Sequence, residues 1–450
     1  MAYCGYVITV KELRPHPNAD KLQLLAVFGT ETCVGLDVKL GDRGVYFPTD
    51  GQLSEEFCAV HDLVRRKDDA GNPAGGFLEP GKRNIKAIKL RGERSDGLYM
   101  PITCLEYTGA NLDDFADGDM ITMVNGHEIC KKYIPRSNPR GSRTPEGNRT
   151  RKKKVPVAPL FAEHADTEQL AYNLAAFRPG DNIEITLKMH GTSQRTGYLP
   201  VLKKMKRSLL DMILRRPGKP VYDWGYVSGT RRTVLENYDG GFYGSNAFRE
   251  QHSKVFEGKL QRGETVYCEV VGFTDTGVPI MPSTNNKKLN DKEFIKQYGE
   301  ETVFSYGCSP AGYDEEKWCN EQKMNELPQS DIYVYRMTIT NEEGFTVEYT
   351  PDFMRYRCEQ MGVKTVPVFW IGRIDPFLVD PGDKVLKVAE QYYDGPDPIG
   401  KTHIREGVVV RILNRPKFAA YKHKNFEFKV LEGIIKNDAE APDMEEAESL

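Results

Sequence analysis

Residues 181–193, DNIEITLKMHGTS, constrain the fold most, because their polarity alternates strictly up to a lysine that is soon followed by a glycine. Alternation with a period of two predicts a β-strand that buries one face and leaves the other polar. The buried face carries Ile183, Ile185 and Leu187, and the polar face carries Glu184, Thr186 and Lys188. A lysine at the end of such a polar face, followed by Gly191, can present its amine to a bound phosphate.

Five segments further along the chain carry charged or aromatic residues at positions typical of strands. They are VSGTRRTVL with Arg231 and Arg232, ETVYCEVVGF with Glu269, DIYVYRMTI with Tyr333 and Tyr335, IREGVVVR with Glu406, and YKHKNFEFK with Lys422 and Lys424. Residues two apart on a strand share a face, so the last two lysines are expected to point the same way. Each residue alone could equally serve packing or a surface ion pair, so only their order is informative.

That order, Lys-x-x-Gly, Arg, Glu, aromatic, Glu-Gly and Lys-x-Lys, resembles the motif series of the covalent nucleotidyltransferases, which include ATP-dependent ligases and mRNA capping enzymes. The resemblance implies that Lys188 attacks the α-phosphorus of ATP and carries AMP as a phosphoramidate. Free lysine has a pKa near ~10.4, so neighbouring cations must favour its neutral amine. Lys422, Lys424 and a Mg²⁺ or Mn²⁺ ion held by Glu406 would supply that charge and neutralise the phosphates.

The same resemblance assigns the remaining nucleotide contacts. It implies that Gly191, Arg232 and Glu269 bind the nucleotide, with Glu269 accepting a hydrogen bond from a ribose hydroxyl, and that Tyr335 stacks on adenine. The chain departs from the relatives at two positions. Leu187 precedes the nucleophile where T4-type ligases have an acidic residue that contacts adenine, and Arg336 follows Tyr335 where an aspartate is usual.

Within the superfamily, the motif Lys188-Met189-His190-Gly191-Thr192-Ser193 is similar to that of the second T4-type RNA ligase group. DNA ligases and capping enzymes usually have aspartate at the position of the histidine. They also carry an OB domain after the Lys-x-Lys motif, whereas only 26 of the 450 residues follow Lys424 here, too few for a barrel.

Residues before the catalytic segment are rich in short apolar runs separated by turn residues, which favours a small sandwich or barrel. Within them, HPNADKLQLLAVF, residues 16–28, resembles the OB-fold RNA-binding modules attached to some tRNA synthetases. An OB-like module that precedes the catalytic domain is similar to the Deinococcus/Naegleria type of RNA ligase. The expected fold is therefore α+β: an OB-like β-barrel joined to a mixed α/β, ATP-grasp-like nucleotidyltransferase domain built on antiparallel sheets.

Composition divides the chain into four parts. Residues 131–154 contain ten Lys or Arg and one acidic residue among many Pro, Gly and Ser, which is typical of a linker. Residues 202–213 place apolar side chains at helical spacing among basic ones, which predicts an amphipathic helix. The expected parts are an OB-like RNA-binding domain 1–126, a basic flexible linker 127–156, a catalytic domain 157–436 with a basic helical insertion at about 198–222, and an acidic disordered tail 437–450.

The sequence thus predicts an ATP-dependent RNA ligase that joins a 3′-hydroxyl to a 5′-phosphate, with a nicked duplex as the expected substrate. Alternatives that remain open are a DNA ligase, a capping-type guanylyltransferase, and a non-catalytic RNA-binding protein with this fold. The chain has no apolar run long enough for a membrane span, and its nine scattered cysteines favour a reducing cytoplasm, that of a host if the source is viral. A monomer is expected. The residues expected to contact RNA are Ser193, Arg231, Lys152, Lys153 and Lys154.

Overall fold

The computed structural model describes residues 3–134, 155–207, 218–238, 243, 245–310 and 327–437. The chain divides into two compact units. One comprises the N-terminal residues up to 135 together with helix α7 (Phe426–Asn437), and the other comprises the residues between them. In these described residues, no helix is both long enough and apolar enough to cross a bilayer.

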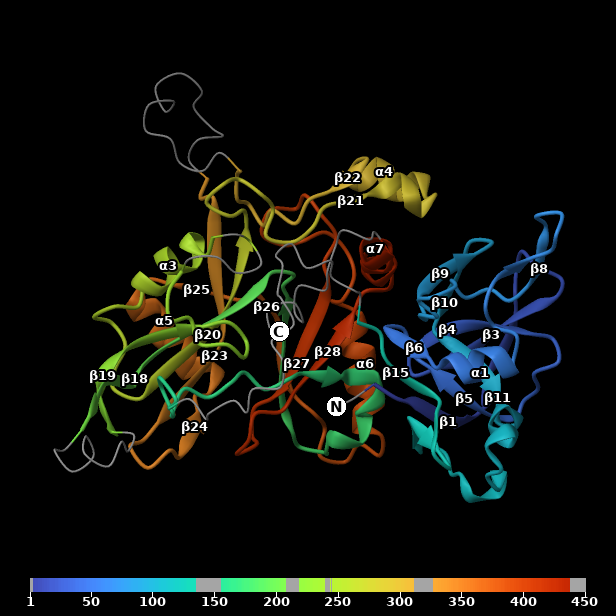
Figure 1. Ribbon diagram of the computed structural model, residues 1–450, viewed down its shortest axis with the longest axis horizontal. Helices are drawn as coiled ribbons and strands as arrows, with labels where there is room; N and C mark the ends of the chain where they lie inside the picture. The colour runs from blue at the N-terminus through green and yellow to red at the C-terminus, as the bar shows by residue number, and fades with distance from the viewer. Residues whose placement is uncertain are drawn as a thin grey trace. The chain divides into compact units, whose positions relative to one another are not determined.

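The N-terminal unit is built from short antiparallel strands (Figure 1). Its four-stranded sheet has the order β11 (Leu98–Pro101), β5 (Arg43–Phe47), β1 (Gly5–Thr9), β12 (Met120–Ile121), and its three-stranded sheet the order β2 (Leu13–Pro15), β3 (Leu22–Val27), β4 (Thr30–Gly35). Two-stranded pairs complete it: β6 (Gly51–Leu53) with β15 (Cys130–Lys132), β7 (Arg66–Lys67) with β8 (Pro73–Gly75), β9 (Ala87–Leu90) with β10 (Glu93–Asp96), and β13 (Met123–Val124) with β14 (His127–Glu128). Across residues 3–134 these pairings do not join into one closed barrel, so the predicted OB-like barrel is not confirmed.

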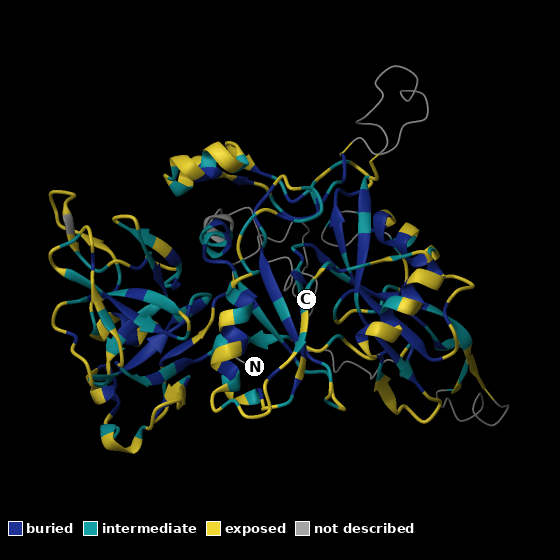
Figure 2. Ribbon diagram, turned by 180° about the vertical axis from the view of Figure 1, so that it is seen from behind, coloured by how far each residue is buried: buried dark blue, intermediate teal, exposed yellow. Residues whose placement is uncertain are grey.

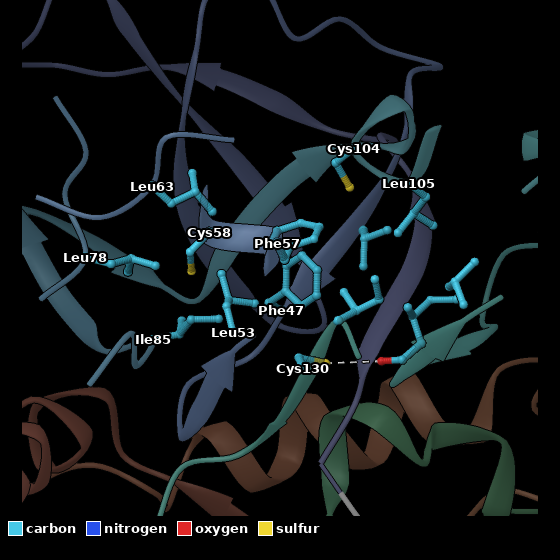
Figure 3. Packing of buried hydrophobic residues seen from close by; sticks show 14 of the residues in the cluster. Phe47, Leu53, Phe57, Cys58, Leu63, Leu78, Ile85, Cys104, Leu105 and Cys130 are labelled. Atoms are coloured by element: carbon cyan, nitrogen blue, oxygen red, sulfur yellow. Dashed lines mark hydrogen bonds between the residues drawn. The ribbon is translucent and has the colours of Figure 1, made fainter. Parts of the chain in front are cut away.

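Aromatic and aliphatic side chains from several of these sheets form the core of the unit (Figure 3). Phe47 of β5 packs edge-on against Phe57, whose helix α1 (Glu55–Val60) begins where Ser54 accepts a hydrogen bond from the Phe57 backbone. Leu53 and Cys58 are fully buried beside them. The core therefore joins a central strand, a two-stranded pair and a helix. Buried side chains hold these elements together, because the strands of residues 3–134 do not pair around a closed barrel.

Helix α7 belongs to this unit although it follows the second unit in the sequence. Phe428 and Leu431 are completely buried, and Lys429 forms an ion pair with Asp96 of β10 at 2.5 Å. Glu427 pairs with Lys89 at 3.1 Å, which adds a second charged contact with the same β-hairpin. Helix α7 therefore packs in the same unit as the N-terminal strands.

The second unit contains two large sheets and the helices that cover them (Figure 1). The five-stranded sheet has the order β16 (Glu168–Gln169), β28 (Ala420–Lys424), β27 (Gly407–Ile412), β17 (Asn182–Lys188), β26 (Val368–Arg373). The other has the order β19 (Lys219–Gly229), β18 (Thr192–Lys206), β20 (Glu264–Gly272), β23 (Ser330–Thr340), β24 (Thr346–Glu348), with β25 (Lys364–Thr365) also paired to β23. The helices are α3 (Ala247–Lys254), α4 (Lys292–Tyr298), α5 (Pro351–Met361) and α6 (Pro381–Glu390). A mixed α/β unit with mainly antiparallel sheets and few helices agrees with the predicted class.

The alternating segment forms β17, as predicted, and its aliphatic face is buried. Ile183 and Ile185 lie in a core with Val408 and Val410 of β27 and Leu386 of α6. This burial leaves the polar face of β17 directed away from that core, toward the other sheet of the unit.

Two predicted parts of the chain differ from the structure. The expected linker 127–156 begins with strands β14 and β15, because Cys130 pairs with Leu53 of β6 and is buried in the core. The helix predicted at about 198–222 is wrong for the residues on both sides of 208–217, because residues 198–206 belong to β18 and residues 219–222 to β19, which pair with each other. Residues 135–154, 208–217 and the tail 438–450 lie outside the described residues.

The placement of α7 predicts that Phe428→Ala destabilises the N-terminal unit. Removing a buried phenylalanine side chain typically costs about 3–5 kcal/mol of unfolding free energy. Hydrogen exchange in residues 3–134 should become faster, whereas the fluorescence of Trp224 and Trp370, which lie in the other unit, should change little. Phe377→Ala is the matched control, since this phenylalanine is 92% exposed. Equal exchange in both variants would show that α7 does not stabilise this unit.

Candidate functional site

A pocket lies between the two sheets of the second unit. It is lined on one side by β17, β27 and β28 and on the other by β18, β20 and β23. Six residues singled out in the sequence line it: Lys188, Gly191, Ser193, Arg231, Glu269 and Tyr335. They are spread over almost 150 positions of the sequence, from 188 to 335, so the fold gathers residues that no local pattern links.

The pocket face of the five-stranded sheet is ordered in rows, because its three central strands pair in register. Lys188 lies opposite Gly407, which lies opposite Lys424. The next row is Thr186, Val409 and Lys422, and the third is Glu184, Arg411 and Ala420. Lys188 and Lys424 therefore lie at one end of the face, Lys422 lies beside Val409 in the middle, and a carboxylate with a guanidinium occupies the other end.

The cationic end is centred on Glu406, a carboxylate that is only 2% exposed. Its Oε1 atom lies 2.7 Å from Lys188 Nζ and 3.4 Å from Lys424 Nζ. Burial by itself raises the pKa of Glu406, but the charges of Lys188 and Lys424, with His190, outweigh burial and lower the pKa to about 2. The glutamate is therefore ionised at any physiological pH, and it holds the two lysines together.

The second oxygen of Glu406 is the part of this cluster that could bind a metal ion. Oε2 is buried and accepts no hydrogen bond from the residues that the structure describes, and His190 Nδ1 lies 3.7 Å away. An ionised carboxylate with one uncommitted oxygen suits Mg²⁺ or Mn²⁺, which bind through one or two carboxylates and retain several waters. The donor set thus fits the predicted metal at Glu406.

Two glycines make this arrangement possible. A Cβ atom on Gly191 would lie 2.4 Å from the Val270 backbone oxygen, so only glycine lets the chain after Lys188 pass this close to β20. Gly407 has φ +145°, which L side chains rarely adopt, and a Cβ atom there would lie 2.1 Å from the His423 backbone oxygen. The Lys-x-x-Gly and Glu-Gly motifs therefore have a steric cause as well as a chemical one.

Buried residues beside the lysine motif hold its backbone. The Tyr306 hydroxyl accepts a hydrogen bond of 2.7 Å from the His190 backbone N–H, and burial raises the pKa of Tyr306 well above its ordinary value. Arg249 of α3 is fully buried and donates to Ser193 O at 3.0 Å and to Thr192 Oγ1 at 2.6 Å. No sequence pattern indicated Tyr306 or Arg249, because both act through tertiary contacts.

On the opposite wall, Tyr335 and Glu269 face the pocket together with Ser193. Ser193 lies opposite Glu269 in the β18–β20 register, and its hydroxyl is 3.0 Å from the Tyr335 hydroxyl. Burial raises the pKa of Tyr335, so its phenol stays neutral. Tyr333, the other candidate aromatic, is buried and does not line the pocket. The imidazole of His164, which the sequence did not single out, lies 5.0 Å from the Tyr335 ring.

The structure places Arg231, and not Arg232, on the pocket wall. Arg231 is 19% exposed and pairs with Asp166 at 2.6 Å, whereas Arg232 is 52% exposed and lies 3.4 Å from the same carboxylate. Arg195 fixes this turn from behind, since its buried guanidinium donates to the backbone oxygens of Thr230 at 2.9 Å and Arg232 at 3.2 Å. Of the two arginines only Arg231 therefore lines the pocket, and the nucleotide-binding role predicted for Arg232 stays a prediction.

The far end of the pocket carries a charged cluster that the motif series does not contain. Glu184 of β17 is buried and forms an ion pair with Arg355 of α5, and both line the pocket beside Arg411. Arg411 lies over the Phe418 ring at 5.0 Å. The signal for Glu184 was present in the sequence, since it shares the polar face of the strand with Lys188.

The remaining predicted residues fall in two groups. Lys422 lies on β28 between Ala420 and Lys424, on the face that looks into the pocket. The three lysines predicted to contact RNA, Lys152, Lys153 and Lys154, lie outside the described residues.

No family model matches the chain, and no curated protein matches it in sequence. Solved structures of Naegleria gruberi RNA ligase are similar in fold. The structure solved with PPi has a TM-score of 0.54 at 17% identity, with 95% of this chain and 98% of that chain covered. Two mutant structures, one with AMP and Mn and one with ATP and Mn, each have a TM-score of 0.53 at 16% identity, with the same coverage. The likeness extends over nearly the full length of both proteins and shows that they share a fold.

The steric account predicts that Gly407→Ala disrupts the cationic end of the pocket. The new Cβ would collide with the β28 backbone in a conformation that alanine avoids, so the unfolding temperature should fall by several degrees. Gly433→Ala in α7 is the control, because no atom lies within 4 Å of its Cβ position and a helix favours alanine. If Gly407→Ala unfolds at the wild-type temperature, the β27–β28 contact is looser than described.

Proposed function

We propose that this protein is an ATP-dependent RNA ligase that joins 3′-hydroxyl and 5′-phosphate ends through a covalent lysyl-AMP. The observation that carries the proposal is the cluster of Lys188, Glu406 and Lys424 beside a pocket that Lys188 lines together with Gly191, Glu269 and Tyr335. The similarity in fold to an RNA ligase that was solved with ATP, AMP and Mn supports it.

In the first step, the Lys188 amine attacks the α-phosphorus of ATP, the bond to the bridging oxygen breaks, and pyrophosphate leaves. Glu406 pairs with the Lys188 amine at 2.7 Å, so this ion pair must loosen before attack. Lys424 lies 3.4 Å from the same Glu406 oxygen and adds positive charge close to the phosphates. A divalent cation at Glu406 would add further charge beside the amine and on the phosphates.

Residues on the different walls of the pocket have different roles in nucleotide binding. Lys422 and Lys424 are placed to neutralise the departing phosphates, and Arg231 to donate to a phosphate or ribose oxygen. Glu269 can accept from the ribose hydroxyls, and the rings of Tyr335, His164 and Phe418 offer apolar surface for the base.

In the second step, AMP passes from Lys188 to the 5′-phosphate of an RNA end and forms a 5′–5′ pyrophosphate linkage. In the third, a 3′-hydroxyl attacks that phosphate, the phosphodiester forms, and AMP departs. The N-terminal unit and the basic segment before Val155 would hold the RNA by neutralising its phosphates. A capping-type or DNA-joining activity is the alternative, and substrate panels separate it from RNA sealing.

The nucleophile is tested by Lys188→Ala and Lys188→Arg. Both should abolish transfer of label from [α-³²P]ATP, because alanine has no amine and arginine stays protonated. Both variants should keep the wild-type circular dichroism spectrum. Labelling at the wild-type level in either one rules out Lys188, and label from GTP in place of ATP would favour the capping-type alternative.

The two adjacent arginines give a matched pair of variants. Arg231→Ala should raise the ATP concentration for half-maximal labelling roughly tenfold to a hundredfold, because a hydrogen bond to a charged group is worth about 1.5–3 kcal/mol. Arg232→Ala removes the same charge from a position outside the pocket and should change this concentration less than threefold. The reverse ranking would return the role to Arg232, as the motif order predicted.

A fragment of residues 155–425 tests the division of labour between the units. It keeps every nucleotide contact and omits α7, whose buried Phe428 and Leu431 belong to the other unit. The fragment should accept label from ATP and should seal a nicked duplex poorly, with a loss that grows as salt rises. If it seals as well as the full chain, the N-terminal unit does not bind the RNA.

A further inference from the structure

Strands β18 and β19 extend beyond the sheet to which they belong. β18 pairs with β20 only from Thr192 to Gly197, and from there to Lys206 its described partner is β19 alone. Figure 1 shows the two strands running together to the edge of the unit. The inner part of the ribbon packs in a small core, where Leu199 and Val227 are buried with Ala158 and Phe161. Residues 203–207 and 219–220 at its outer end are exposed, and a two-stranded ribbon is only marginally stable by itself.

Aromatic pairs on one face stabilise this ribbon. Tyr198 stacks on Tyr226 of the opposite strand with ring centroids 4.7 Å apart, and Trp224 lies 5.8 Å from Tyr198. The Arg262 guanidinium covers the Trp224 ring at 5.3 Å. Such cross-strand aromatic contacts stabilise a ribbon where no further strand supports it.

The outer end of the ribbon is strongly basic. Its cations are Lys203, Lys204, Lys206, Arg207 and Lys219, and all five are exposed (Figure 2). None of them forms an ion pair with a residue that the structure describes. The single acidic residue among the described ones here is Asp223, whose carboxylate accepts from the Trp224 backbone N–H. The end of the ribbon therefore carries five cations against one carboxylate among its described residues.

The register shows which face these cations occupy. Lys206 lies opposite Lys219 and Lys204 opposite Val221, on the side of the ribbon where Val201 lies opposite Asp223. That side continues along β18 to Ser193, which lines the pocket, because residues at alternate positions share a face. The aromatic pairs occupy the other side. The basic end and the pocket thus belong to the same face of one long strand.

The distance between the pocket and the basic end of the ribbon suits a nucleic-acid duplex. Ser193 and Lys203 are ten residue steps apart along β18, which at a rise of about 3.3 Å per residue gives about 33 Å. Duplex RNA adopts the A form, whose turn is somewhat shorter than the roughly 34–36 Å of B-form DNA, so this distance corresponds to about one turn of an RNA duplex. A duplex whose break lies at the pocket would present its phosphates again near the ribbon end, about one turn away.

We propose that the basic end of the β18–β19 ribbon binds the phosphate backbone of duplex RNA about one helical turn from the break. This inference rests on the proposed ligase function, because that function places the break in the duplex at the pocket. The chemistry is phosphate neutralisation by lysine and arginine, which is independent of sequence and sensitive to salt. The ribbon would therefore select substrates by the length of duplex beside the break.

The test is a variant of the full-length protein with Lys203, Lys204, Lys206 and Lys219 changed to alanine. Its control changes four exposed lysines on α4 and α6, namely Lys292, Lys296, Lys384 and Lys387, to alanine. Both proteins are assayed for labelling from [α-³²P]ATP and for sealing of nicked RNA duplexes, with arms shorter or longer than one turn beside the nick, over a range of salt.

The ribbon variant should label like the control, which also shows that it is folded. It should seal long-armed duplexes at least tenfold more slowly than the control at moderate salt, and the two should be equal on short-armed duplexes. The slope of log affinity against log salt should shrink by about 3 to 4, since up to four phosphate contacts are lost. Equal sealing and equal salt slopes on long arms would overturn the proposal.

Binding of duplex RNA without ATP separates this inference from the proposed function. If the wild-type protein fails to label but the ribbon variant binds long duplexes more weakly than the control, the ribbon binds RNA and the ligase proposal is wrong. If labelling succeeds and binding is equal, the ligase proposal stands and the ribbon has no such role.

Discussion

The ion pairs of Glu406 with Lys188 and Lys424 are the interaction on which the rest of the site depends. Three strands must pair in register for these charges to meet, and Gly407 must adopt a backbone that other residues avoid. A buried carboxylate that lost its lysines would be strongly destabilising, so the fold and the chemistry share one set of constraints. Lys188 is thus held in an ion pair with Glu406, and a nucleotide that engaged Lys188 would have to displace this ion pair.

Strand β17 could be predicted from the sequence because its polarity alternates strictly. Lys188, Glu269 and Tyr335 could be predicted to lie together because they belong to one ordered series of motifs. The choice between Arg231 and Arg232 could not, since neighbours on a turn differ only in tertiary contacts such as those of Asp166 and Arg195. The helix predicted at 198–222 was wrong in its described parts. Apolar residues such as Leu202 and Met205 fit a helical period, but they pair with β19, and a local sequence pattern does not reveal such pairing.

Helix α7 connects the two units in an unexpected way. It begins two residues after Lys424, yet its buried side chains pack within the N-terminal unit. The strand that carries both lysines of the Lys-x-Lys motif therefore continues directly into a helix of the other unit. The boundary between the units therefore falls between Asn425 and Phe426, so this helix belongs to the N-terminal unit.

The central claim is that Lys188 becomes covalently linked to AMP. The most direct measurement is to incubate the protein with ATP and Mg²⁺ or Mn²⁺ and to map the modified peptide by mass spectrometry under conditions that preserve a phosphoramidate. The account predicts one adenylate per chain, located on Lys188 and absent when Glu406 is replaced by alanine. An adenylate on Lys422, Lys424 or another residue, or an unmodified chain from protein that is folded and binds ATP, would contradict it.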